Sequence, residues 1–415
     1  MCAKIINKNS KDGFKMKKHN VAILGFGVVG GGVGDLLTNN CKEISSYTDC
    51  DVRISHILDL RDFPGSPFER LVTHNYDDIL NDKDVDTVIE VMGGSHPAYE
   101  YTVAALKAGK NVISSNKEVV ANFGDEFLKI AKEYNVSYKF EASVGGGIPV
   151  ISPLINCVRQ NKITEIRGIL NGTTNYILTM MFTYGASFDS ALKDAQDKGY
   201  AERNPDADIL GIDASRKITI LTALMTDTLY NVADVHTEGI TKIRSQDIKA
   251  AEGIAHSIKL LGRCIVNDGK PYVMVAPFLI PKDAPLGSVS GVFNAVEVIG
   301  EPLGSAMFYG PGAGAGATAS AVVGDLIQIL TSKEAKAPTF ARGDFKPSDS
   351  FSSFVCRNYI AIPTSDKSKV ESKFGNVTFI ESEECAFVTE PISENELDQI
   401  ISDCGISILS RIRFL

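Results

Sequence analysis

Short apolar runs alternate with amphipathic segments over the first third of the chain. Strands are expected over 20–25, 52–58, 86–91, 111–114 and 137–140, and helices over 33–40, 77–80, 97–108 and 124–134. Strands that alternate with helices form parallel sheets, because each helix carries the chain back by a right-handed crossover. The pattern therefore predicts an α/β fold with a doubly wound parallel sheet of the Rossmann type over 20–142.

The pattern changes in the middle of the chain, where apolar runs follow one another with few helices between them. Strands are expected over 163–170, 272–280 and 291–299; a helix is expected from the segment 171–175 to about 183, and another over 208–225. This order predicts a mixed α+β domain. A further helix, expected over 317–330, would return to pack on the first domain.

The two ends of the chain carry other patterns. Residues 336–350 are polar and contain Pro, Gly and basic residues, which is typical of a linker. Residues 351–415 show the order strand, helix, strand, strand, helix, strand, which predicts a small βαββαβ module. Residues 1–19 are polar and basic, which predicts a flexible extension rather than a secretory signal.

Composition and charge narrow the classes of function. The 415 residues are 44% apolar and 22% charged, which is ordinary for a globular chain of two or three domains. The net charge of −9 argues against nucleic acid as a partner, and no apolar run approaches the roughly 20 residues of a membrane span. Eight scattered cysteines, none in a C-x-x-C pair, predict free thiols in a cytoplasmic protein without a zinc site.

Gly25, Gly27 and Gly30 form a G-x-G-x-x-G motif directly after the first expected strand. In a dinucleotide site the first glycine permits a tight turn, the second lets the backbone approach a pyrophosphate, and the third lets the helix pack on the strand. The helix N-terminus adds N–H groups and positive partial charge that suit phosphates. The motif predicts dinucleotide binding, and a purely structural turn is the alternative.

Three further residues follow strands of the same sheet, where ligands bind at the carboxyl ends. Asp59 can bind a ribose hydroxyl, which favours NAD, whereas Arg61 can bind a 2′-phosphate, which favours NADP; the sequence leaves this choice open. Lys117 follows the strand over 111–114 and can hold a substrate carboxylate or the cofactor. The alternative for all three is an exposed turn or surface position.

A glycine-dense segment over 141–149 follows the last strand of the first domain. A flexible backbone of this kind can point carbonyl oxygens at one cation, but the residues alone favour the alternative, a tight turn between domains.

The segment over 199–217 is the richest in reactive side chains. Asp213 and Lys217 are four residues apart, so they share one helical face, and Glu202 and Asp208 lie close by in sequence. A surface ion pair is one account of this spacing. The other is a substrate cation held by carboxylates, with Lys217 as the proton donor to a carbonyl that is being reduced. Asp206 or Asp208 is expected to cap the helix.

At this point the sequence resembles the homoserine dehydrogenase family. The resemblance is carried by GFGVVG, SNKEVVA, FEASVGGGIPVI, GILNGTTNYIL, GYAERNPDADILGIDASRKITIL and GPGAGAGATASAVVGD, in the family's order over about 20–330. The module over 351–415 resembles a shortened ACT regulatory domain. No turn of the Arg/Asp-Pro-Gly type follows its first strand, so the sequence leaves open whether it binds threonine or another effector.

The resemblance implies reversible reduction of L-aspartate 4-semialdehyde to L-homoserine with NAD(P)H, in threonine, methionine and isoleucine biosynthesis. It implies that Lys217 and Asp213 are catalytic, and that the substrate is bound by Glu202, Asp208, Asp213, Gly172, Thr173, Tyr200 and Lys117. The cofactor would lie against Gly25, Phe26, Gly27, Val28, Val29, Gly30, Asp59, Arg61, Gly93, Gly94, Ser115, Lys117, Gly199 and Gly314. A sodium ion would be bound by main-chain carbonyls of Glu141, Val144, Gly146 and Ile148.

The resemblance also gives each part of the chain a role. It implies a dinucleotide-binding domain over 20–142 and 313–335, a substrate-binding and dimerisation domain over 143–312, a linker over 336–350 and an ACT-like domain over 351–415. A homodimer or homotetramer is expected. Two other functions remain as alternatives: another two-domain NAD(P)-dependent oxidoreductase of the sugar dehydrogenase type, and a non-catalytic amino-acid sensor.

Overall fold

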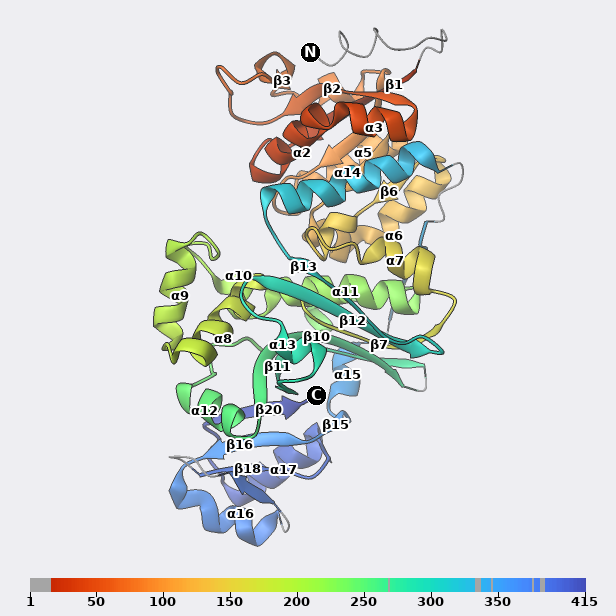
Figure 1. Ribbon diagram of the computed structural model, residues 1–415. Helices are drawn as coiled ribbons and strands as arrows, with labels where there is room; N and C mark the ends of the chain where they lie inside the picture. Colours follow the sequence, from red (N-terminus) through yellow and green to blue (C-terminus); the bar gives the residue numbers. More distant parts are fainter. Residues whose placement is uncertain (1–15, 268, 333–336, 345, 375–376, 381–384) are drawn as a thin grey trace. The chain divides into compact units, whose positions relative to one another are not determined.

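The chain folds as two compact units, which Figure 1 colours along the sequence. The computed structural model describes residues 16–267, 269–332, 337–344, 346–374, 377–380 and 385–415. The first unit comprises Met1–Cys157 and Ala313–Arg342, and the second comprises Val158–Gly312 and Gly343–Leu415. No helix among the described residues is both long enough and apolar enough to cross a bilayer.

The first unit contains a sheet in which every neighbouring pair of strands is parallel. In spatial order its strands are β3 (Val72–Thr73), β2 (Cys50–Leu58), β1 (Lys17–Leu24), β4 (Val85–Glu90), β5 (Asn111–Ser114) and β6 (Tyr138–Lys139). This 3-2-1-4-5-6 order is that of a doubly wound dinucleotide-binding fold, whose ligands bind where the order reverses between β1 and β4. The predicted parallel α/β fold is confirmed.

Helices of the first unit pack around this sheet, and all but the last two of them lie between its strands in the chain. They are α2 (Val28–Asn39), α3 (Cys41–Thr48), α4 (Asp77–Leu80), α5 (Ala98–Lys107), α6 (Lys117–Glu133), α7 (Ile151–Pro153) and α14 (Ala315–Thr331). Ile23, Val33 and Val322 are fully buried in the core that β1, α2 and α14 share. A Cβ on Gly32 of α2 would lie 2.8 Å from the carbonyl oxygen of Ala315, so glycine there permits close helix packing.

The second unit is built on a mixed sheet. Among the described residues its path runs through β13 (Gly304–Pro311), β12 (Phe293–Glu301), β7 (Lys162–Ile169), β10 (His256–Asn267), β11 (Lys270–Pro281), β20 (Ser410–Phe414), β16 (Asn358–Ile362), β18 (Cys385–Val388) and β17 (Thr378–Ile380), with β9 (His236–Thr237) beside β11. Its helices are α8 (Gly172–Tyr184), α9 (Phe188–Asp197), α10 (Asp206–Ile209), α11 (Ile212–Thr226), α12 (Ser245–Gly253), α13 (Pro285–Ser288), α15 (Pro347–Phe351), α16 (Lys367–Lys373) and α17 (Glu394–Cys404). The predicted mixed-sheet domain is confirmed.

The C-terminal part of the chain joins this sheet through its last strand. β20 pairs in parallel with β11, with Arg413 opposite Phe278, and pairs antiparallel with β16 on its other side. From β16 to β20 the main elements are β16, α16, β17, β18, α17 and β20. The last strand therefore belongs both to the C-terminal module and to the sheet that carries β7, β10 and β11.

Several element boundaries differ from the sequence predictions. The helix predicted over 208–225 is divided into α10 and α11, because Gly211 adopts φ +82° between them. Neither Asp206 nor Asp208 is its N-cap, since both lie inside α10. The helical spacing of Ile209, Ile212, Ile220 and Leu224 predicts that all four are buried, but Ile212 is 38% exposed.

The ends of the expected segments also shift. β1 begins at Lys17, so three residues of the extension expected over 1–19 are in a strand, and residues 1–15 lie outside the described chain. α2 begins at Val28, directly after the glycine turn, rather than at 33. The segment expected to be a linker ends in α15, and its residues 336 and 345 lie outside the described chain.

Candidate active site

The glycine motif forms a turn at the carboxyl end of β1. Gly25 has φ +90°, which only glycine adopts readily, and a Cβ on Gly30 would lie 2.0 Å from the Gly25 carbonyl oxygen. Gly27 is the N-cap of α2, and a Cβ there would meet no atom within 4 Å. The open space over Gly27, at the N-terminus of a 12-residue helix, fits a cofactor pyrophosphate.

Asp59 fixes this turn from the end of β2. Its Oδ2 accepts the N–H of Phe26 at 2.7 Å, and its Oδ1 accepts Nε of Arg61 at 2.9 Å. The hydrogen bond from Arg61 lowers the pKa of Asp59 to about 2. The Phe26 ring packs edge-on against Phe63 and Phe68 in the core, so Phe26 can offer a cofactor only its backbone.

The carboxyl ends of β4 and β5 lie beside each other in the same sheet. Asn116 donates from Nδ2 to the Gly94 carbonyl at 2.7 Å, and its Oδ1 accepts the N–H of Glu118, which caps α6. The Ser115 N–H donates to the Glu90 carbonyl. Lys117 is the first residue of α6 and is half-buried, so the structure places it at the predicted edge of the sheet.

The remaining predicted cofactor residues occupy different surroundings. Val28 is 73% exposed, whereas Val29 packs against the core. Gly94 has φ +77° after β4, and Gly314 has φ +121° as the N-cap of α14 in the same unit. Gly199 has φ +74° but belongs to the second unit.

Replacing Gly27 by alanine is expected to raise the dissociation constant for NADPH at least about tenfold, because the methyl group would fill the space over the helix N-terminus. Stability should change little, since no atom beyond the adjoining residues of the chain lies within 4 Å of the added Cβ. Gly31→Ala is the matched control, because Gly31 is the residue directly after the motif and a Cβ there also meets nothing within 4 Å. Fluorescence titration with NADPH measures the effect, and equal affinities for the two variants would contradict it.

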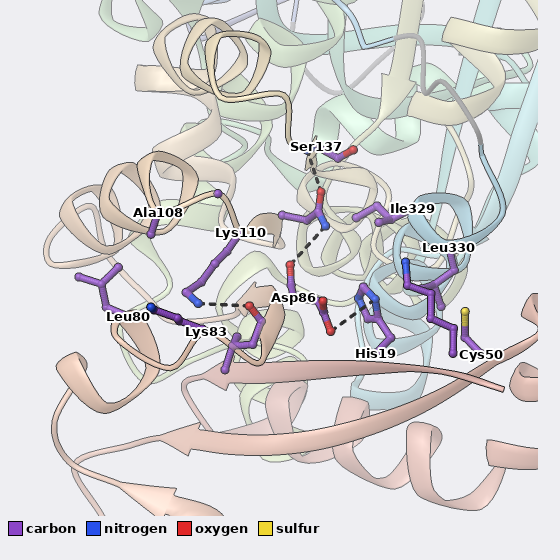
Figure 2. A pocket seen from close by; sticks show the side chains of 14 residues that line it. His19, Cys50, Leu80, Lys83, Asp86, Ala108, Lys110, Ser137, Ile329 and Leu330 are labelled. Carbon is purple, nitrogen blue, oxygen red and sulfur yellow. Dashed lines mark hydrogen bonds and ion pairs between the residues drawn. The ribbon is translucent and has the colours of Figure 1, made fainter. Parts of the chain in front are cut away.

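A cavity of about 490 Å³ lies elsewhere in the first unit (Figure 2). Its walls include His19, Asp86 and Lys110, at the amino-terminal ends of β1, β4 and β5. The Lys110 Nζ donates to the Asp82 carbonyl, and the His19 Nε2 lies 2.9 Å from the Thr87 hydroxyl. This cavity is at the opposite ends of the strands from the glycine turn, so it lies apart from the predicted cofactor site.

In the second unit, the structure buries Lys217 rather than exposing it. Its side chain is 10% exposed, and Nζ donates to Asp213 Oδ2 at 2.7 Å and to the Leu170 carbonyl at 2.8 Å. Asp213 is 4% exposed, so the predicted pair on one face of α11 is a buried ion pair. This geometry excludes the alternative of a surface ion pair.

Asn171 holds the two acidic groups together, and the sequence analysis did not single it out. Its Nδ2 donates to Asp208 Oδ1 at 2.7 Å and to Asp213 Oδ2 at 3.0 Å, while its Oδ1 accepts the N–H of Thr174 and caps α8. The N-cap position at the start of the NGTT motif was the available signal. Asp208 and Asp213 lie about 40 residues away from Asn171 in the sequence, so no local pattern could predict that it binds them.

Asp208 has an unusual environment for a carboxylate. Burial raises its pKa, and the negative charge of Asp213 raises it further, whereas the hydrogen bond from Asn171 and the charge of Lys217 act in the opposite direction. A second positive group beside Asp208 would therefore relieve the repulsion between the two carboxylates. A substrate ammonium is such a group.

The turn before α8 forms another part of this cluster. A Cβ on Gly172 would lie 2.6 Å from the Val292 carbonyl oxygen, so the turn packs closely against the start of β12. The Thr173 hydroxyl donates to the Tyr200 carbonyl at 2.6 Å, which links α8 to the segment after α9. The structure thus brings Gly172, Thr173 and Tyr200 together with Asp208.

Glu202 stands apart from this cluster. Its side chain is exposed and makes none of the hydrogen bonds that join Asn171, Asp208, Asp213 and Lys217. Its backbone carbonyl accepts Nε2 of Gln196 at 3.1 Å.

The predicted cation-binding loop is in the first unit and is held by one side chain. The Glu141 carboxylate accepts the N–H groups of Val150, Ile151 and Ser152, at 2.6 to 2.8 Å. Gly146 has φ +60°, and a Cβ on Gly147 would lie 2.8 Å from the Ala317 Cβ. In the part of the chain that the structure describes, no group of three His, Cys, Asp or Glu side chains is arranged as metal ligands.

A doubly wound sheet with a glycine turn at its switch point, and a buried lysine beside carboxylates, together define a nicotinamide-dependent oxidoreductase. A family model described as homoserine dehydrogenase matches residues 149–327, and a model described as its NAD binding domain matches residues 25–141. The chain belongs to the homoserine dehydrogenase family.

Individual relatives agree with this assignment. The chain is 37% identical over 371 residues to homoserine dehydrogenase of Bacillus subtilis, covering 86% of this chain and 85% of the relative. It is 41% identical over 331 residues to that of Neisseria gonorrhoeae, covering 77% and 74%. A crystal structure of a homoserine dehydrogenase from Thiobacillus denitrificans is similar with a TM-score of 0.86 and 32% identity, covering 96% of this chain and 99% of that one.

A solved structure also bears on the cofactor. A hyperthermophilic archaeal homoserine dehydrogenase mutant in complex with NADPH has a TM-score of 0.65 and 27% identity, and the similarity covers 78% of this chain and 100% of that one. Together with the matched NAD binding domain, this supports a nicotinamide cofactor. The sugar dehydrogenase and amino-acid sensor alternatives are not favoured.

Proposed function

We propose that Lys217 is the proton donor in the reversible reduction of L-aspartate 4-semialdehyde to L-homoserine. A bound reduced nicotinamide supplies the hydride, and negative charge then develops on the carbonyl oxygen. A buried ammonium stabilises this charge and gives the oxygen a proton. The observation that carries the proposal is the burial of Lys217, with its Nζ 2.7 Å from Asp213.

Asp213 is proposed as the group that orients Lys217. It lies one helical turn before Lys217 on α11, while the Leu170 carbonyl approaches from the end of β7. Two acceptors on different elements restrict the rotamers of the lysine side chain. The ammonium is therefore fixed before the substrate binds, so little reorganisation is needed during the reaction.

Asp208 is proposed to bind the ammonium group of the substrate, with Gly172, Thr173 and Tyr200 beside it. Support comes from the raised pKa of Asp208. Burial and the nearby charge of Asp213 both disfavour the ionised form of this carboxylate, and a bound ammonium would stabilise that form. Glu202 retains its proposed role as a second, more exposed partner. Lys117 is proposed to bind the cofactor or the substrate carboxylate.

The cofactor is proposed to bind over the glycine turn, with its adenosine ribose near Asp59 and Arg61. Asp59 already accepts the Phe26 N–H and the Arg61 side chain, which leaves it less available to a ribose hydroxyl. The Arg61 side chain is 62% exposed and can reach an added phosphate. This arrangement favours NADP over NAD.

Arg61→Ala is expected to raise the KM for NADPH about tenfold or more, because a charge-assisted hydrogen bond to the 2′-phosphate is lost. The KM for NADH should stay the same or fall, since Asp59 loses its competing partner. Arg70→Ala, an exposed arginine in the same unit, is the control. An equal change for both cofactors would contradict the phosphate contact.

A sodium ion is proposed at the carbonyl oxygens of Glu141, Val144, Gly146 and Ile148. Support comes from the turn itself: among the described residues, no backbone N–H donates to the carbonyl oxygens of Val144, Gly146 or Ile148, which lie outside helices and strands. Unpaired carbonyls of this kind suit a hard cation. No step of the reaction depends on this ion.

The C-terminal module is proposed to be ACT-like, on the order of its strands and helices. The last strand of this module, β20, pairs with β11, which connects the module directly to the strands around the candidate site.

We also propose the domain roles that the sequence resemblance implies. The protein is proposed to be a homodimer or homotetramer and to be located in the cytoplasm.

A substrate analogue tests the proposed function. Homoserine should be oxidised with the formation of NADPH or NADH, whereas 4-hydroxybutanoate, which lacks the ammonium group, should have a kcat/KM at least about 100-fold lower. The factor reflects the loss of a buried charged partner. Similar values for the two compounds would exclude Asp208 as an ammonium-binding group.

A further inference from the structure

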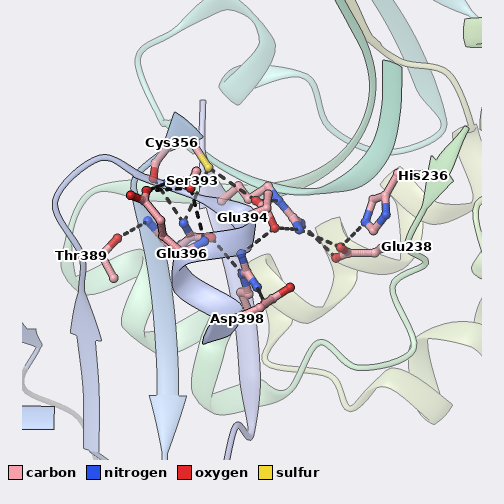
Figure 3. Close-up of polar contacts among 11 residues, drawn as sticks. His236, Glu238, Cys356, Thr389, Ser393, Glu394, Glu396 and Asp398 are labelled. Carbon is pink, nitrogen blue, oxygen red and sulfur yellow. Dashed lines mark hydrogen bonds and ion pairs between the residues drawn. The ribbon is translucent and has the colours of Figure 1, made fainter. Parts of the chain in front are cut away.

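A partly buried cluster of charges joins the C-terminal module to the rest of the second unit (Figure 3). Arg413 of β20 is 2% exposed and forms two contacts with Glu394 of α17, at 2.8 and 2.9 Å. The same guanidinium contacts both carboxylate oxygens of Glu238, at 2.9 and 3.1 Å. Arg413 therefore holds one carboxylate from the module and one from the segment after β9.

Glu238 is firmly held in its ionised form. Burial alone would raise its pKa, but the hydrogen bond from His236 and the charge of Arg413 lower the pKa of Glu238 to about 2. The His236 Nε2 lies 2.6 Å from Oε1, and the His236 ring stacks on Phe351. The side chain of Glu238 thus has partners on two sides.

The backbone at Glu238 lies against the turn between α10 and α11. The Ile240 N–H donates to the Ile209 carbonyl at 2.9 Å. A Cβ on Gly239 would lie 2.1 Å from that same carbonyl oxygen, and a Cβ on Gly211 would lie 3.2 Å from the Glu238 carbonyl oxygen. We call residues 238–240 the support segment and residues 209–211 the helix turn.

The helix turn has the candidate substrate carboxylates directly on either side. Asp208 directly precedes it, and Asp213, the second residue of α11, lies two residues after it. A shift of the support segment must displace the Ile209 carbonyl or break its bond to Ile240. Either change would move Asp208 and Asp213 relative to Asn171, which binds both of them.

We propose that Glu238 and Arg413 are positioning residues for the substrate site. Arg413 fixes Glu238, the support segment then fixes the helix turn, and the turn sets the separation of Asp208 and Asp213. The C-terminal strand therefore completes the substrate site without contacting it. This inference rests on the proposed roles of Asp208 and Asp213.

Glu238→Gln tests the inference in the full-length enzyme. The variant keeps the size of the side chain but removes its charge, so the KM for homoserine should rise at least fivefold. The KM for NADPH should change by less than twofold. Hydrogen exchange at the Ile240 amide should become faster, because its bond to the helix turn is loosened.

Arg411→Gln is the matched control. Arg411 lies on the same strand and contacts Glu394, Asp398 and Asn358, all of them in the C-terminal module. Its loss should lower the melting temperature without changing the KM for homoserine. Arg413→Lys, which keeps a positive charge, should give a smaller increase in KM than Glu238→Gln and serves as the second variant if the first does not fold.

An unchanged KM for homoserine in both Glu238→Gln and Arg413→Lys, with only a lower melting temperature, would overturn the inference. An Arg411→Gln variant with the same increase in KM would also overturn it, since general destabilisation would then be sufficient. Asp208→Asn distinguishes a failure of this inference from a failure of the proposed function. If Asp208→Asn raises the KM for homoserine and Glu238→Gln does not, the inference is wrong but the proposed role of Asp208 stands.

Discussion

Replacing Lys217 by methionine is expected to lower kcat for homoserine oxidation roughly 1000-fold, within the range that general acid–base catalysis supplies. Methionine keeps most of the apolar volume and removes the ammonium that would face the substrate oxygen. The dissociation constant for NADPH should stay within about twofold of the wild-type value, because the glycine turn is in the other unit. Steady-state assays and cofactor titration measure both quantities.

Lys193→Met is the control for this substitution. Lys193 also has an aspartate four residues away on a helix, Asp197, but both side chains are more than 60% exposed. Its replacement should leave kcat unchanged. Circular dichroism of the Lys217 variant is needed, since removing one partner of a buried ion pair also destabilises the fold. A folded Lys217→Met enzyme with wild-type kcat would exclude Lys217 from the chemistry.

Asp208→Asn is expected to raise the KM for homoserine roughly 10- to 100-fold, because a hydrogen bond to a charged partner contributes about 1.5–3 kcal/mol.

The pH profile of kcat/KM gives a second test of Asp208. Since burial raises the pKa of Asp208, this group takes up a proton at a higher pH than an ordinary aspartate. The wild-type kcat/KM should fall as the pH falls through that raised value, and the Asn variant should lack this fall.

Asp206→Asn is the matched control, since Asp206 is on the same helix and exposed. It should change neither the KM for homoserine nor the acidic limb of the profile. If Asp208→Asn and Asp206→Asn behave alike, the ammonium of the substrate is bound elsewhere.

Local patterns were enough to predict the first unit. The glycine motif after an apolar strand depends on contacts only a few residues apart, such as Gly30 against Gly25. The spacing of Asp213 and Lys217 likewise placed them on one helical face. Spacing alone could not show that the pair is buried, because burial depends on β7 and on the Leu170 carbonyl.

Contacts between distant segments explain what the sequence could not show. Asn171 binds two carboxylates that no helical or strand period relates to it. Gly211 interrupts an otherwise continuous helical pattern, and its close neighbours Thr237 and Val275 belong to the distant strands β9 and β11. The pairing of β20 with β11 has the same origin, so the connection from the C-terminal module to the helix turn emerged only from the structure.

The central claim is that the ammonium of Lys217 faces the reacting oxygen of the substrate. A crystal structure of the enzyme with homoserine and oxidised cofactor tests it most directly. In that structure Lys217 Nζ is expected within about 3.2 Å of the homoserine hydroxyl oxygen, with the substrate ammonium beside Asp208. A hydroxyl held by another side chain, with Lys217 making no hydrogen bond to the substrate, would contradict it.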